Sequence, residues 1–146
     1  MDPVDFYHLA VRLMAAGPAP DAASCRTAIG RAYYAALNRA DEALSRWGVS
    51  CGKGPQKHGL ALRFLHATAD PDLRFASAAL DRLRGLRNRT DYDMNDAAIE
   101  TPSSASSALG LAKKVLDHLK TVDTDPARRT SAESQIRSYR RKTNTP

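Results

Sequence analysis

Apolar residues recur every three or four positions along most of the chain, which is the spacing of one face of an α-helix. Four long segments and one shorter segment carry this pattern: residues 2–16, 21–47, 70–92 and 103–122, and residues 57–69. No segment shows the alternation that is typical of a β-strand. We therefore predict an all-α fold, an up-and-down helical bundle of four main helices plus a short helix.

Residues that favour helix ends support these boundaries. Candidate N-cap residues precede the four main helices: Asp2, Asp21, Asp70, and Ser103 or Ser104. Proline follows two of these caps, in the first helical turn, where it is tolerated. The sequence Gly17-Pro18-Ala19-Pro20 is a strong stop for the first helix. Polar loops are expected at residues 48–56 and 93–102.

The C-terminal residues differ in character from the rest of the chain. The sequence Asp123-Thr124-Asp125-Pro126 breaks the helical pattern, and beyond it Ile136 and Tyr139 are the only large apolar residues. Residues 131–142 could form a short basic helix, but two such residues cannot bury a core face by themselves. We therefore expect one helical unit of residues 1–122, followed by a basic tail at residues 123–146 that is flexible or becomes ordered on a partner.

The positive charge of the chain is concentrated in this tail. The net charge is +6, and residues 126–146 contain six basic residues and one acidic residue, a balance of +5. The remaining 125 residues are nearly neutral, so overall basicity is a weak argument for nucleic-acid binding. The chain has no apolar run of about 18 residues, so no membrane span is predicted. The acidic N-terminus does not resemble a signal peptide, so a cytoplasmic protein is expected.

Few residues suggest metal or cofactor chemistry. We expect Cys25 to be a small buried apolar residue and Cys51 to be a loop thiol. The two cysteines do not form a metal-binding motif. The four histidines lie in different segments without paired ligand spacing: His8, His58, His66 and His118. Solvated or capping roles are expected for them, and only His8 and His118 are candidates for a shared groove. We predict no metal site and no cofactor.

The segment Leu86-Arg87-Asn88-Arg89-Thr90-Asp91-Tyr92-Asp93 is the most unusual, because it gathers many hydrogen-bonding groups at the end of an amphipathic helix. Arg84, Arg87 and Asp91 fall on one helix face. One interpretation is an exposed face with Arg87–Asp91 and Arg89–Asp93 ion pairs, each worth about 0.3–0.5 kcal/mol. The other is a phosphate-binding cradle of guanidinium groups. Spacing alone slightly favours the ion pairs.

Two segments resemble the signatures of the HEPN family. They are Arg31-Ala32-Tyr33-Tyr34-Ala35-Ala36-Leu37 and the segment from Leu86 to Asp93. The resemblance implies a four- or five-helix bundle, commonly a homodimer. Many members are metal-independent ribonucleases of toxin–antitoxin, phage-defence or CRISPR systems. Others are non-catalytic RNA-binding or scaffold modules, often encoded beside a minimal nucleotidyltransferase.

The chain departs from the family's catalytic pattern at one position. Arg87 matches the arginine and Asn88 the polar residue, but Tyr92 stands where the active members have histidine. Tyrosine, with an ordinary pKa near 10, is a weaker base than histidine at neutral pH. A variant branch of the family carries an Asp-Tyr pair here, as in Asp91-Tyr92. Arg87 and Tyr92 lie about 140° apart on an ideal helix. We therefore expect either the helix to end between them or the site to be composite across a dimer axis.

The leading hypothesis is a HEPN-like homodimer that binds or cleaves RNA without a metal. The resemblance assigns Arg87 to the phosphate, Asn88 to a 2′-hydroxyl or phosphate oxygen, and Tyr92 to orientation or proton transfer. Asp91 would fix Arg87 or act as the substitute base. Additional attraction for RNA would come from Arg84, Arg89, Arg140 and Arg141.

Two other hypotheses are open. In one, the same face of a non-catalytic module binds RNA or a partner protein, such as a nucleotidyltransferase antitoxin or a larger defence complex. The absent histidine favours this hypothesis. In the other, the polar segment is only a network at a dimer interface.

Overall fold

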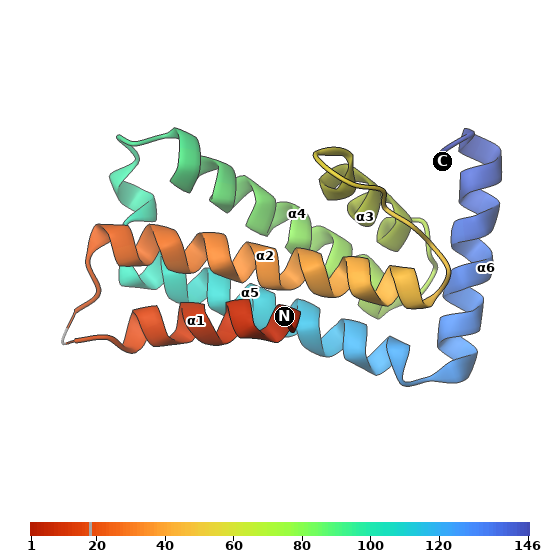
Figure 1. Ribbon diagram of the computed structural model, residues 1–146, viewed down its shortest axis with the longest axis horizontal. Helices are drawn as coiled ribbons and strands as arrows, with labels where there is room; N and C mark the ends of the chain where they lie inside the picture. The colour runs from red at the N-terminus through yellow and green to blue at the C-terminus, as the bar shows by residue number, and fades with distance from the viewer. Residues whose placement is uncertain (18) are drawn as a thin grey trace.

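The computed structural model describes residues 1–17 and 19–146, and its regular elements are all helical (Figure 1). They are α1 (Pro3–Ala15), α2 (Ala22–Arg46), α3 (Gln56–His66), α4 (Pro71–Tyr92), the 3₁₀ turn η1 (Ala97–Ile99), α5 (Pro102–Asp123) and α6 (Pro126–Thr143). The described residues contain no β-strand. The all-α prediction is confirmed, with one helix, α6, more than the sequence pattern indicates.

Except for α3, the α-helices begin where a side chain accepts hydrogen bonds from the free backbone N–H groups of the first turn. Asp2 accepts from Val4, Asp21 from Ser24, and Asp70 from both Asp72 and Leu73. The cap of α5 is Thr101, slightly before the predicted serines. Helix α1 ends at Ala15. Of the predicted stop at residues 17–20, Pro18 lies outside the described residues.

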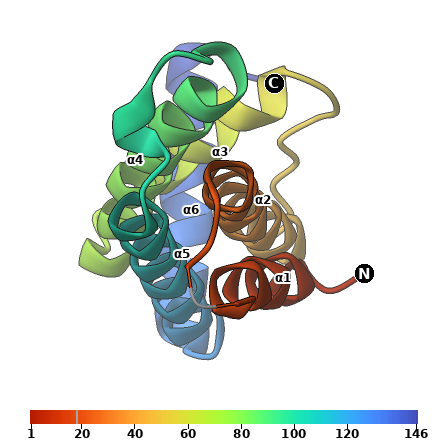
Figure 2. The same ribbon diagram turned by 90° about the vertical axis from the view of Figure 1, so that its left-hand side faces the viewer.

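Helix α2 lies at the centre of the fold and packs against α1, α4 and α5 (Figure 2). Its buried face is rich in alanine, including Ala28, Ala32 and Ala36, each fully buried. Small side chains let neighbouring helices approach closely. Larger buried side chains of the same region include Tyr33 in the middle of α2, beside His58 of α3, and Trp47 at the C-terminal end of α2.

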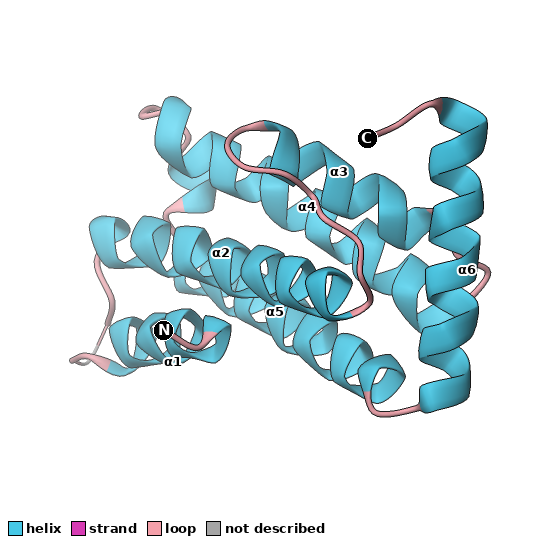
Figure 3. Ribbon diagram, turned by 45° about the vertical axis from the view of Figure 1, so that its right-hand side comes forward, coloured by secondary structure: helices cyan, strands magenta, loops and turns pink. Residues whose placement is uncertain are grey.

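The C-terminal residues form a helix that packs on the rest of the chain, which corrects the expectation of a flexible tail. Helix α6 runs across one end of the other helices (Figures 1 and 3). Its apolar residues Ala132 and Ile136 are 1% and 0% exposed, and Tyr139 packs against the core beside Phe64. The prediction is wrong because a helix with one buried stripe needs no core of its own when other helices supply it.

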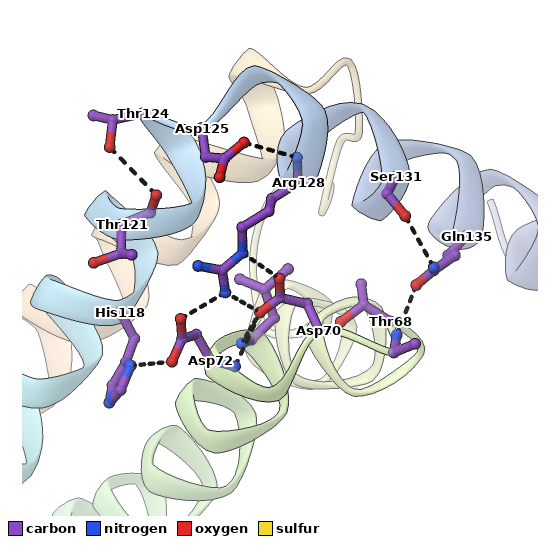
Figure 4. Close-up of polar contacts among 12 residues, drawn as sticks. Thr68, Asp70, Asp72, His118, Thr121, Thr124, Asp125, Arg128, Ser131 and Gln135 are labelled. Carbon is purple, nitrogen blue, oxygen red and sulfur yellow. Dashed lines mark hydrogen bonds and ion pairs between the residues drawn. The ribbon is translucent and has the colours of Figure 1, made fainter.

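Polar contacts also attach α6 to the other helices. Figure 4 shows Arg128, at the start of α6, reaching two carboxylates at the start of α4. Its guanidinium lies 2.8 Å from Asp70 and 2.6 Å from Asp72, and Asp72 also contacts His118 of α5 at 2.8 Å. Farther along, the Gln135 side chain accepts a hydrogen bond of 2.6 Å from the Ala69 N–H. These contacts set the position of α6 relative to α3, α4 and α5.

Both cysteines are buried, which changes the interpretation of one of them. Cys25 is fully buried, as predicted, but Cys51 is 1% exposed and is not an accessible loop thiol. Burial raises the pKa of Cys51 to about 12. The segment that connects α2 to α3 therefore places a side chain from outside any helix in the core. None of the helices in the described part of the chain is long and apolar enough to cross a membrane.

Candidate functional site

A pocket of about 300 Å³ lies where the last turns of α4 face α2 and the start of α3. Its lining residues are Tyr33, Pro55, His58, Arg84, Arg87, Asn88 and Tyr92. Four of these, Arg84, Arg87, Asn88 and Tyr92, are site residues predicted from the sequence. The structure therefore brings half of the predicted site residues together in this pocket, and it adds a histidine and a second tyrosine from other helices.

Arg87 and Tyr92 lie in the same pocket of one chain, which corrects the geometric expectation. Helix α4 continues through Tyr92. The guanidinium carbon of Arg87 lies 5.5 Å from the centre of the Tyr92 ring and 5.7 Å from the centre of the Tyr34 ring, within cation–π range of both. The prediction that a continuous helix keeps them apart is wrong because it considered the helix positions alone, whereas the long Arg87 side chain extends around the helix. A site shared across a dimer axis stays a prediction.

Polar contacts hold the Arg87 guanidinium in place. Its Nε lies 2.8 Å from an Asp91 carboxylate oxygen, as the i, i+4 spacing predicts, although the contact is an ion pair without hydrogen-bond alignment. One Nη donates to the Tyr34 hydroxyl at 3.1 Å, and the other donates to Asn88 at 3.3 Å. Burial lowers the pKa of Arg87, but contacts with Tyr92, Asp91 and Tyr34 outweigh that effect and raise it. Arg87 is therefore a fixed positive charge in the pocket wall.

The other predicted residues lie outside this pocket. Arg89 is paired with Asp96 at 2.6 Å, so the predicted Arg89–Asp93 pair is wrong. Asp91 lines another pocket, together with Tyr34 and Arg26. Arg140 and Arg141 line a third pocket at the end of α6.

His58 is the residue of this pocket with acid–base chemistry that the sequence analysis did not select. Its Nδ1 is hydrogen-bonded to the hydroxyl of Tyr33, and the two rings stack with their centres 5.7 Å apart. Partial burial lowers the pKa of His58, and the charges of Arg84, Arg87 and Lys57 lower it further. At neutral pH the imidazole is therefore mainly neutral, the form that can accept a proton.

Neither His8 nor His118, the two candidates from the sequence, lines this pocket. His118 is paired with Asp72 on α4, as Figure 4 shows, and not with the pocket. The one local signal for His58 was Tyr33, because a buried tyrosine hydroxyl usually has a hydrogen-bond partner. Tyr33 is 1% exposed, and burial raises its pKa to about 12, so the phenol stays protonated beside the imidazole.

Arg26 fixes the end of α4 that carries the pocket. Its guanidinium donates hydrogen bonds to the carbonyl oxygens of Thr90 at 2.7 Å and Asp93 at 2.9 Å, and its Nε is paired with Glu100 at 2.7 Å. The last carbonyls of a helix lack partners within the helix, and a cation there also complements the helix dipole. These partners are distant in sequence, so spacing could not predict this role.

Comparisons with known protein families, curated proteins and solved structures find no match to this chain. Within the described residues, no three histidine, cysteine, aspartate or glutamate side chains come together in an arrangement that could hold a metal ion. The site is therefore characterised by its own groups, which are one imidazole, two tyrosine hydroxyls, an amide and two guanidiniums around one small pocket.

Proposed function

We propose that the chain is a metal-independent endoribonuclease that binds a phosphodiester of RNA in the His58 pocket. The observation that carries the proposal is that His58, Arg84 and Arg87 line one pocket. The resemblance to HEPN nucleases requires a histidine in this region, and His58 supplies one from α3 instead of α4. A HEPN-like organisation, with α1, α2, α4 and α5 as the bundle, is part of this proposal.

The roles follow from the chemistry of each group. Arg84 and Arg87 bind the phosphate and stabilise the negative charge that grows on it during cleavage. Asp91 holds Arg87, which agrees with their 2.8 Å ion pair. Asn88, exposed at the pocket wall, binds a 2′-hydroxyl or a phosphate oxygen.

Proton transfer is assigned to His58 and Tyr92. In the tautomer whose Nδ1–H donates to the Tyr33 oxygen, the Nε2 atom of His58 carries no proton and takes the proton of the ribose 2′-hydroxyl. The 2′-oxygen attacks phosphorus, the bond to the 5′-oxygen breaks, and that oxygen takes a proton from the Tyr92 hydroxyl. The products are a 2′,3′-cyclic phosphate and a 5′-hydroxyl. The proton on His58 then returns to Tyr92, which restores the starting state.

The test is cleavage of a mixed RNA pool in the presence of EDTA. The variants are His58→Asn, which keeps a polar partner for Tyr33, with Arg87→Ala and Tyr92→Phe. His66→Asn is the matched control, because His66 is exposed on the same helix and lies outside the pocket. We expect cyclic-phosphate products from the wild type and from the control, and a loss of about 100-fold or more in His58→Asn.

Two results would overturn the nuclease proposal. One is the absence of cleavage by the wild-type protein, and the other is equal cleavage by His58→Asn with normal circular dichroism. Cleavage that EDTA abolishes would also contradict a metal-independent mechanism.

A non-catalytic interaction module is the second candidate, and exposed side chains at the end of α4 favour it. Tyr92 and Met94 are 76% and 73% exposed. Large exposed apolar side chains next to each other are common where proteins bind partners. In this candidate the partner is a second copy of the chain, a nucleotidyltransferase or a defence complex. Light scattering of the wild type and of Tyr92→Ser/Met94→Ser tests the homodimer, because the double variant would then be a monomer.

A further inference from the structure

Three pockets adjoin one another along the side of the molecule where α6 ends beside α3. The His58 pocket shares Pro55 and Arg84 with a pocket of about 370 Å³. That second pocket shares Thr145 with a third, of about 480 Å³, at the end of α6. Figure 3 shows the chain turning back toward α3 after α6. The three hollows therefore form one continuous track.

The side chains along this track are positive. Its six arginines are Arg63, Arg84, Arg87, Arg137, Arg140 and Arg141, and no aspartate or glutamate side chain lines any of the three pockets. Arg87 and Arg137 are paired with carboxylates outside the track, whereas the other four form no ion pair with any described residue. Unpaired cations along a groove attract a polyanion.

We infer that this track binds a single strand of RNA, which enters over α6 and delivers one phosphodiester to the His58 pocket. The inference rests on the proposed function and adds to it the form of the substrate and the role of α6. Helix α6 is thereby part of the binding site, although it contributes no group to the His58 pocket.

The shape and the aromatic side chains favour a single strand over a duplex. Proteins that bind single strands combine a positive groove with aromatic side chains on which bases stack. At the His58 end of the track, the Tyr92 ring is 76% exposed and available to a base. A duplex keeps its bases stacked inside and cannot place one there. An acidic protein segment would match the charge but not the stacking surface.

The experiment measures binding of a fluorescent 2′-O-methyl RNA, which cannot be cleaved through its 2′-oxygen. The strand is roughly 12 nucleotides long, within the range of known single-strand sites. The variant is Arg63→Gln/Arg141→Gln, and the control is Arg74→Gln/Arg82→Gln. All four arginines are exposed and form no ion pair with a described residue, but only the first two lie on the track.

We expect the track variant to bind about 25-fold more weakly at 0.1 M salt, with a salt slope shallower by about 1.4, because each phosphate contact contributes about 0.7 to that slope. The control should bind as the wild type does. Equal binding by both double variants would overturn the inference. So would equal affinity for a duplex, or equally effective competition by polyglutamate, which would indicate an acidic protein partner.

The outcome separates this inference from the proposed nuclease activity. If the track variant loses binding while no RNA is cleaved by any protein, RNA binding by the track is supported and the nuclease proposal fails. If a dinucleotide is cleaved normally and the track variant binds the longer strand as the wild type does, the nuclease activity is supported and RNA binding by the track is contradicted. His58→Asn should retain binding of the uncleavable strand in either case.

Discussion

The packing of α6 against the other helices depends on the buried side chain of Ile136. Truncating this side chain measures how strongly α6 is held. Ile136 is 0% exposed. Ile136→Ala removes three carbon atoms, each worth about 0.8 kcal/mol of burial, or about 2.4 kcal/mol together. The cavity left behind adds to this loss, and comparable substitutions cost about 2–5 kcal/mol. We therefore expect a loss of about 3 kcal/mol.

Hydrogen exchange followed along the chain is the suitable assay, because α6 can detach without unfolding the other helices. A loss of about 3 kcal/mol lowers the protection of α6 amides by roughly 150-fold, since about 1.4 kcal/mol corresponds to a factor of ten. Amides of α2 report whether the loss is local or global. Ser134→Ala, at an exposed position of the same helix, is the control and should change protection by less than about 0.5 kcal/mol.

Two results would refute this reasoning. Exchange of wild-type α6 amides at the rate of an unfolded peptide would show that α6 is the flexible tail suggested by its sequence. A loss below about 1 kcal/mol in Ile136→Ala would show that Ile136 does not hold the helix against the core.

The remaining predictions concern titratable groups. Arg84→Gln should raise the pKa of His58, because it removes a cation that disfavours the protonated imidazole; an unchanged NMR titration would contradict this interpretation. The Tyr33 phenol, with its pKa raised from 10.0 to about 12, should give an ionisation step near pH 12 in an absorbance titration, and Tyr33→Phe should remove that step. Its contribution to stability should be complete below pH 10 and lost as pH rises toward 12. Cys25 and Cys51 should react with a thiol reagent only after urea is added, whereas rapid labelling of native Cys51 would show that it is accessible.

Part of the candidate site could be predicted because it lies within one helix. Arg87 and Asp91 are four residues apart, and their ion pair follows from helix geometry alone. The gathering of Arg84, Arg87, Asn88 and Tyr92 also comes from closely spaced positions on α4. Even here, the separation of Arg87 and Tyr92 predicted from their spacing is wrong, because the length of a side chain matters as much as its angle on the helix.

The rest of the site depends on contacts between distant segments. His58 and Tyr33 are 25 residues apart, and Arg26 reaches carbonyl groups 64 and 67 residues away. No periodic pattern relates such residues, so their meeting depends on how α2, α3 and α4 pack. The same packing explains why Cys51 is buried although it lies in a loop.

By itself, the sequence determined the helical class and most helix boundaries. These features can be predicted without a structure because the signals act within a few residues. They are N-caps such as Asp21 and Asp70, and apolar residues spaced by three or four. Only the tertiary structure decided that α6 is docked and that a histidine joins the arginines of α4. Both depend on a surface that other helices supply: the core that covers Ile136 and the pocket wall that holds His58.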